Sequence, residues 1–439
     1  MAGAVFSAAA CLFSTLAYAA DSTAVAQNAA SPQNPNQAPP ANGEPLPPSS
    51  QSVAPVPAGA QPTDTDFFNG IVGAAITYDD NLFRLGSGTD AQPLIGHSRK
   101  GDMLYSVDAG VKVDKPYGLQ RFQLDALVTD HRYQENGYLN WTGLDYRGAW
   151  LWQITPHLGG ELSASQTQSL ADYSDYRVYN VRNIQTVQTQ KGNFDWWIDG
   201  GWHLLGGVIG TESRNTAVFT AVGSFDQQTA EAAVRYVTRD GSSLTFTGRE
   251  SQGQYQDRPL DPVAVFDNHF KQHEAEMRGI WLIDAQSTLD ARLGYLARRH
   301  EHFSQRDFSG PVGRIDYIWT PTVKVIVDVS AARSLYSFQE FTNSYYVADS
   351  LSLQPKWLIT EKTSLHAKAD LTTRDFRGAV AATPTMRYEK IYTLSVGAEW
   401  KATRKIKVNA DISHQQRNSN FAGFSYVDNM IGLNAQFMF

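Results

Sequence analysis

The last nine residues, 431–439, read IGLNAQFMF. Every odd position holds an apolar side chain, and Gly, Asn, Gln and Met fill the even positions; the apolar residues are Ile431, Leu433, Ala435, Phe437 and Phe439. Successive side chains of a β-strand point to opposite faces. The stretch therefore predicts a strand with one apolar and one mostly polar face, ending on an aromatic residue in phase with the apolar side.

The same alternation recurs along the chain from about residue 67, for example over 103–113, 323–331 and 392–400. A hydrophobic period of two predicts strands that have one apolar and one polar face. We count 18 such strands, with 16 as the alternative count. Their predicted centres lie near residues 75, 108, 127, 149, 163, 193, 209, 232, 249, 276, 293, 314, 328, 352, 368, 393, 410 and 433.

Short turns follow an aromatic residue repeatedly, at Tyr236, Trp281, Trp319, Trp357 and Trp400, which lie 45, 38, 38 and 43 residues apart. This spacing indicates one hairpin repeated about every 40 residues. Longer polar connections separate the hairpins, at 81–101, 169–185, 255–268, 299–308, 333–345, 373–386 and 415–426. Short turns at one end and long loops at the other are typical of a transmembrane antiparallel β-barrel, with the aromatic residues as a girdle at the membrane interface.

In such a barrel the apolar faces contact lipid and the charged faces line an aqueous lumen. A soluble barrel with an apolar core predicts the same alternation with the charges facing water, so the aromatic turns and the terminal Phe favour the membrane form. The pore-wall candidates are the charged residues of the polar face, chiefly Arg147, Arg235, Glu274, Glu276, Arg278, Asp290, Arg292, Arg314 and Asp316. An even number of strands places both chain ends on the periplasmic side.

The composition excludes several classes of function. The 439 residues carry 44 Asp and Glu against 37 Lys and Arg, which disfavours binding of nucleic acid. The single cysteine excludes disulfide frameworks and cysteine-based zinc sites. We find no catalytic or nucleotide-binding motif, and the Glu274–Glu276 pair is explained by a paired pore wall more simply than by acid–base catalysis. We expect no enzymatic activity, cofactor or metal.

The N-terminal part predicts export. Residues 1–20 form an apolar, small-residue stretch that ends in an A-x-A-like site, as in a signal peptide. Residues 21–66 are rich in Pro, Ala, Gln and Asn, a composition that predicts a disordered periplasmic linker. The barrel is then expected over residues 67–439.

The first predicted strand ends with Tyr78, Asp79, Asp80, Asn81, Leu82, Phe83 and Arg84. This phrase, the Trp-turn hairpins and the terminal Phe resemble the EpsL-like outer-membrane proteins, which accompany exopolysaccharide and exosortase loci of Gram-negative bacteria. The resemblance covers about residues 67–439. It implies an outer-membrane location and a role in export of an extracellular polysaccharide.

The leading functional expectation is accordingly a water-filled channel for an exopolysaccharide chain, and the alternative is a diffusion porin for general or small solutes. The partners expected are outer-membrane lipid and lipopolysaccharide, the polysaccharide itself, and inner-membrane export components. Phe437 and Phe439 of the last strand resemble the signal that the outer-membrane assembly machinery recognises.

Overall fold

The computed structural model describes residues 67–217, 223–340, 342–380 and 386–439. The predicted signal peptide and linker, residues 1–66, lie outside the described residues. Within the described ranges the chain forms 18 strands, and every predicted centre falls inside one of them. The strands are β1 (Phe68–Asp79), β2 (Asp102–Tyr117), β3 (Gln120–Tyr133), β4 (Trp141–Thr155), β5 (Leu158–Leu170), β6 (Ile184–Asp199), β7 (Trp202–Asn215), β8 (Phe225–Val237), β9 (Ser243–Tyr255), β10 (His269–Leu282), β11 (Ser287–His300), β12 (Phe308–Thr322), β13 (Val325–Ser337), β14 (Tyr345–Leu358), β15 (Thr363–Arg377), β16 (Tyr388–Lys401), β17 (Ile406–Ser419) and β18 (Tyr426–Met438).

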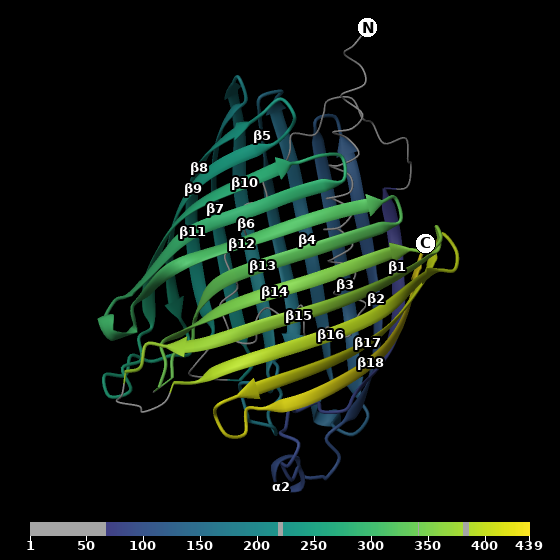
Figure 1. The fold of residues 1–439 in the computed structure, drawn as a ribbon, viewed down its shortest axis with the longest axis vertical. Helices are drawn as coiled ribbons and strands as arrows, with labels where there is room; N and C mark the ends of the chain where they lie inside the picture. Colours follow the sequence, from purple (N-terminus) through teal and green to yellow (C-terminus); the bar gives the residue numbers. More distant parts are fainter. Residues whose placement is uncertain (1–66, 218–222, 341, 381–385) are drawn as a thin grey trace.

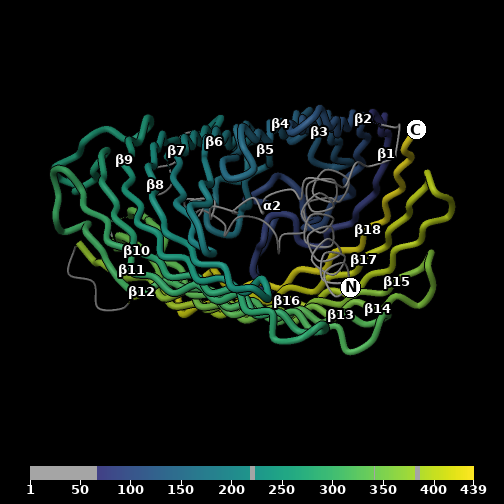
Figure 2. Tube along the Cα trace, turned by 90° about the horizontal axis from the view of Figure 1, so that it is seen from above, coloured from purple at the N-terminus to yellow at the C-terminus, as the bar shows by residue number. Residues whose placement is uncertain are grey.

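The strands form one closed antiparallel ring in sequence order (Figures 1 and 2). The closing contact joins β1 to β18, with Ile71 opposite Met438 and Asp79 opposite Met430. Two backbone hydrogen bonds extend this contact, because Gly70 and Phe439 each donate an amide to the other's carbonyl, at 2.7 and 2.9 Å. Closure leaves no strand edge unpaired, as a structure that crosses lipid requires.

The apolar face of each strand is exposed and the polar face is buried, which is the reverse of the arrangement in a soluble protein. On β16, Leu394 and Val396 are 54% and 52% exposed, whereas the intervening Ser395 is 8% exposed. The same order holds around the ring, where large apolar side chains face out and polar side chains are buried inside. An outward apolar face is stable only against lipid, so the soluble barrel considered from the sequence is excluded.

The predicted aromatic girdle lies at the end of the barrel that carries the short turns. Trp281, Trp319, Trp357 and Trp400 all belong to the last turn-proximal residues of their strands, and all four are exposed. An exposed ring at this level suits the membrane interface, where an indole contacts lipid and water together. At the start of the barrel, Asp114 near the β2–β3 turn donates its amide N–H to the carbonyl oxygen of Phe67, at 2.9 Å. The start of β1 and the end of β18 therefore both lie at the short-turn end.

The long connections occupy the other end, where the helix α2 (Gln92–Ile95) is seen at the bottom of Figure 1. Several are shorter than the sequence predicts, because β13 continues to Ser337 and β17 to Ser419. Two connections, 134–140 and 216–224, were not predicted. At the end of β17, residues 415–419 are polar on both faces, so the hydrophobic alternation ends before the hydrogen-bonded ladder does. The one-turn helices η1 (Gly137–Leu139) and η2 (Ser304–Arg306) lie in these connections. Among the described residues no helix has the length and apolar character needed to cross a membrane.

Candidate functional site

The β5–β6 connection, residues 171–183, reaches the opposite side of the barrel; we name it the crossing loop. Its Asp175 contacts Arg374 on β15 and Arg417 on β17. In either direction around the ring, at least five strands separate β5 and β6 from β15 and β17. Contact between them is therefore made across the opening of the barrel. Seen from above in Figure 2, loop segments that include α2 project within the outline of the ring of strands.

At the far wall the Asp175 carboxylate is held by three guanidinium groups. Arg374 donates to one carboxylate oxygen at 3.0 Å, and Arg417 donates to the other at 2.5 Å, together with Arg387. Glu389 accepts from Arg417 at 2.5 Å and from Arg387 at 2.6 Å. All five side chains are buried. We name these five residues the arginine cluster.

The arginine cluster carries three positive and two negative formal charges, so Asp175 is needed to keep the surplus at one. Burial alone favours the neutral carboxylic acid, but the guanidiniums of Arg417, Arg374 and Arg387 outweigh burial and hold the pKa of Asp175 well below its usual range. Asp175 therefore stays ionised in the closed position. Charge-assisted hydrogen bonds of this kind are about twice as strong as neutral ones.

Aromatic contacts hold the crossing loop beside the arginine cluster. Tyr176 packs against a buried cluster from β13, β14 and β15, and the guanidinium of Arg177 lies 4.3 Å from the ring centroid of Phe424. The guanidinium of Arg387 lies 4.0 Å from the same centroid, so Phe424 contacts both the far wall and the crossing loop. The buried cluster that Tyr176 contacts consists of Tyr336, Phe338, Tyr346, Ala348 and Phe376.

On the near side, the crossing loop packs on the first residues after β1. The ring of Phe83 lies 5.0 Å from that of Tyr173 and 6.0 Å from that of Tyr179, and Leu139 completes the buried contact. Tyr173 also donates its hydroxyl to the carbonyl of Val181 at 3.1 Å. The crossing loop is therefore fixed at two places: an aromatic cluster holds it on the near side, and the arginine cluster holds its tip at the far wall.

The residues that carry the family resemblance have structural roles here. Arg84 pairs with Asp79 at 2.9 Å and with Asp428 on β18 at 2.7 Å, and its Nε lies 4.0 Å from Asp172 of the crossing loop. Asn81 donates to the carbonyls of Leu85 and of Val427 on β18, both at 2.8 Å. Leu82 packs against the Phe83 cluster, and Tyr78 is exposed on the lipid side. The motif thus joins the β1–β18 closure to the crossing loop.

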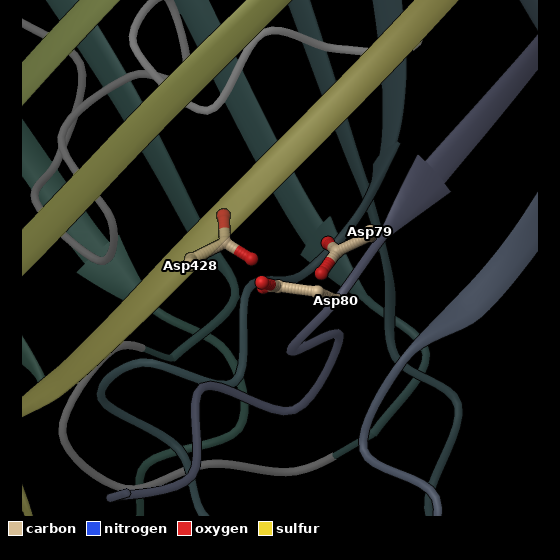
Figure 3. Close-up of side chains that lie close together, drawn as sticks. All are labelled: Asp79, Asp80 and Asp428. Carbon is tan, nitrogen blue, oxygen red and sulfur yellow. The ribbon is translucent and has the colours of Figure 1, made fainter.

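Asp79, Asp80 and Asp428 bring carboxylate oxygens within 4.8 Å of one another (Figure 3). The guanidinium of Arg84 already supplies a cation to Asp79 and Asp428. Asp80 instead accepts hydrogen bonds from the backbone and side-chain amides of Asn429, at 2.8 and 2.6 Å. These contacts account for all three carboxylates, and they make the group part of the closure.

The pore-wall candidates lie on the inward face of their strands. Glu274 and Glu276 pair with Arg249, at 3.0 and 3.2 Å, and not with Arg278 as their shared strand suggests. Arg278 pairs instead with Asp290 at 2.5 Å. For these three residues of β10 the charge partners therefore lie on the neighbouring strands β9 and β11.

The other candidates also lie in charge pairs. Arg314 pairs with Asp316 at 2.5 Å and Arg147 with Glu161 at 3.4 Å. Arg292 lies 3.8 Å from Asp290, and Arg235 pairs with Asp195. None of these candidates belongs to the arginine cluster, which the sequence did not single out. The available signal was the crossing loop itself, where Tyr173, Tyr176 and Tyr179 recur every third residue in a segment predicted to be a polar connection.

Comparison with known proteins supports the channel-forming fold. Residues 285–439 match a family described as "Putative beta-barrel porin 2". A BenF-like porin from Pseudomonas fluorescens Pf-5 superposes with a TM-score of 0.50 at 11% identity, covering 84% of this chain and 98% of that one. The chain has the fold of a porin, a closed antiparallel barrel of 18 strands.

Two further porin structures give similar but lower scores. OccK9 (OpdG) from Pseudomonas aeruginosa has a TM-score of 0.49 at 11% identity, covering 85% of this chain and 98% of its own. OccAB3 from Acinetobacter baumannii has a TM-score of 0.48 at 11% identity, with coverages of 85% and 99%. No curated protein matches the chain significantly. At 11% identity the BenF-like porin shows the fold of this barrel and not its substrate.

Proposed function

We propose that this porin-like barrel is a diffusion channel for small hydrophilic solutes. The observation that carries the proposal is the crossing loop, which is fixed to the opposite wall by the arginine cluster. A fixed segment across a polar lumen narrows the passage and leaves it hydrated. Small solutes pass such a passage singly, and the paired charges along the wall bind them weakly enough to release them.

Export of a polysaccharide, the leading expectation from the sequence, is less well supported. A polymer has to lie beside the crossing loop during its entire transit, whereas a small solute occupies that level briefly. The motif that carries the resemblance to the EpsL-like proteins is accounted for by contacts that close the barrel, through Arg84 and Asn81. The family description and the shared fold favour a porin of the diffusion type.

A size-exclusion experiment tests the proposal. Liposomes that contain the purified protein should swell in monosaccharides and disaccharides and resist swelling as the oligosaccharide lengthens. A variant with residues 173–180 replaced by an equal number of Gly and Ser residues keeps the barrel and removes both anchors of the crossing loop. We expect this variant to admit longer oligosaccharides than the wild type.

The rival function makes the opposite prediction in cells. If wild-type liposomes do not swell in any of these sugars, and deletion of the gene leaves polysaccharide accumulating in the periplasm, the diffusion proposal is rejected in favour of export. Swelling that is identical in the wild type and in the loop variant would instead show that the crossing loop does not set the size limit.

We further propose that the short-turn end faces the periplasm and the crossing loop faces the outside of the cell. The placement of β1 and β18 supports this orientation, because both termini of the barrel lie at the short-turn end. Outer-membrane barrels have short periplasmic turns and long external loops. Protease added to intact cells should cleave only within the long connections; cleavage in the short turns of intact cells would reverse the orientation.

A further inference from the structure

We propose that the crossing loop is a displaceable latch: Arg374, Arg387 and Arg417 form a carboxylate-binding site that Asp175 occupies from within the chain, and that a carboxylate of a permeating solute takes over. The inference rests on the proposed function and assigns it a class of solute, namely small organic acids. It also assigns the site a consequence, which is the release of the crossing loop when that solute binds.

The fit of the site to a carboxylate is demonstrated by the carboxylate that it holds. Both oxygens of Asp175 accept guanidinium hydrogen bonds, one from Arg374 and one from Arg387 and Arg417. The planar N–H fork of arginine matches the geometry of a carboxylate better than the point charge of lysine does. A solute carboxylate that enters the site finds donors already positioned.

Charge balance requires that the site stays occupied. Once Asp175 leaves, Arg374, Arg387 and Arg417 keep ion pairs, among the described residues, with Glu389 alone. An uncompensated buried charge is strongly unfavourable, so the crossing loop does not leave the site empty. Exchange of Asp175 for an external carboxylate keeps the pairing intact, and the equilibrium then depends on the difference in affinity between the two carboxylates.

The attachment of the crossing loop is of a kind that can be exchanged. Among the described residues, its backbone–backbone hydrogen bonds are local: Ala171 donates to Asn183 at the base, and Val181 donates to Val178. At the far wall, side chains make the contacts, including Arg417, which donates to the carbonyl of Ser174 at 3.0 Å. No strand ladder has to break when the tip of the loop moves, so opening has to replace only the contacts that residues 174–177 make with the far wall.

Hydrogen exchange and single-channel recording together test the latch, with succinate as the anionic probe and succinamide as its neutral analogue. Asp175→Asn removes the charge and keeps the shape of the side chain. Asp172→Asn is the matched control on the same loop: asparagine keeps the oxygen that accepts the Ser174 amide at 2.8 Å, and the Arg84 that lies 4.0 Å from Asp172 keeps its two closer carboxylates. Arg417→Gln opens the site from the wall side.

In the wild type, succinate should accelerate exchange of the amides in 171–183 by about tenfold, the factor that corresponds to ~1.4 kcal/mol, and should raise the conductance stepwise. Succinamide should do neither. D175N and R417Q should both exchange rapidly without a probe and show no further acceleration by succinate, while D172N behaves as the wild type. The folding of each variant is checked by its heat-dependent shift in electrophoretic mobility.

Two results would overturn the inference: wild-type exchange rates in folded D175N, or equal effects of succinate and succinamide. The outcomes also separate the latch from the proposed function. If succinate accelerates amide exchange but the wild type neither conducts nor supports swelling, the latch is supported and the diffusion channel is rejected. If the wild type conducts but succinate does not change amide exchange in residues 171–183, the channel is supported and the latch is rejected.

Discussion

At the scale of single residues, Asp175 and Arg417 show how this barrel uses charge. Most inward charges pair with partners on their own or a neighbouring strand, as Arg278 does with Asp290. Asp175 and Arg417 pair across 242 positions of sequence and across the opening of the barrel. An ion pair within the wall leaves the shape of the lumen unchanged, whereas a pair across the opening fixes the position of a loop in the path of the solute.

We predict that acid does not release this contact. A carboxylate whose pKa is lower in the closed position than in the open one stabilises the closed position above the ordinary Asp pKa of about 3.9. That stabilisation is lost only as the pH falls through the closed-state pKa of Asp175, which lies below its usual range. Wild-type conductance without added anion should therefore be the same at pH 7 and at about pH 5.

Other acidic groups near Asp175 provide the control for this measurement. Glu389 lies in the arginine cluster, and burial raises the pKa of the nearby Glu340 above its ordinary value. If conductance increases at pH 5 and the increase persists in Glu340→Gln, the assignment of Asp175 as an ionised latch at that pH is wrong. If Glu340→Gln abolishes the increase, the acid response belongs to Glu340.

The arginine cluster was beyond sequence-based prediction for a geometric reason. Alternation along one strand determines which way Arg374 and Arg417 face, and both belong to the inward phase of their strands. Which loop meets them depends on closure of the ring, which places the β5–β6 connection opposite β15 and β17. No local pattern near Asp175 encodes that meeting. By contrast, alternation together with the spacing of the turns predicted the positions of all 18 strands of the described residues.

At the scale of the element, neighbouring residues of one strand have different surroundings, because one side chain faces lipid and the next faces the lumen. Leu394 of β16 faces lipid, and Ser395, the next residue, faces the lumen. The polar groups of the inward face have hydrogen-bonding partners or water, whereas a charge on the outward face has only hydrocarbon. Adjacent positions of one strand should therefore respond very differently to the same substitution.

We predict that Leu394→Arg destabilises the folded barrel by about 2–4 kcal/mol, the cost of arginine near the middle of the lipid face. Ser395→Arg is the matched control, and it should leave stability nearly unchanged while altering ion selectivity. Both effects are measured by urea unfolding in lipid vesicles and by reversal potentials in a salt gradient. Equal destabilisation by the two variants would contradict the assignment of the faces.

At the scale of the whole molecule, one contact closes the ring and joins the ends of the barrel. The ring of Phe439 covers the face of Gly70, so a Cβ atom added at Gly70 would lie 2.6 Å from a ring carbon of Phe439. Gly248, on the outward face of β9, has open space at the same position. A side chain at residue 70 therefore requires the ring of Phe439 to move, whereas at residue 248 no neighbour has to move.

We predict that Gly70→Val weakens closure by about 1–3 kcal/mol, the usual cost of overpacking, and that Gly248→Val does not. The double variant Gly70→Val/Phe439→Ala should recover most of the lost stability, because it removes the ring that the valine meets.

We also propose that Phe439, with Phe437, is recognised by the outer-membrane assembly machinery. Packing and assembly can be separated in the double variant: if it is stable when refolded in vesicles yet scarce in the outer membrane of cells, Phe439 acts in assembly apart from its contact with Gly70. Normal amounts in cells would limit its role to the closing contact.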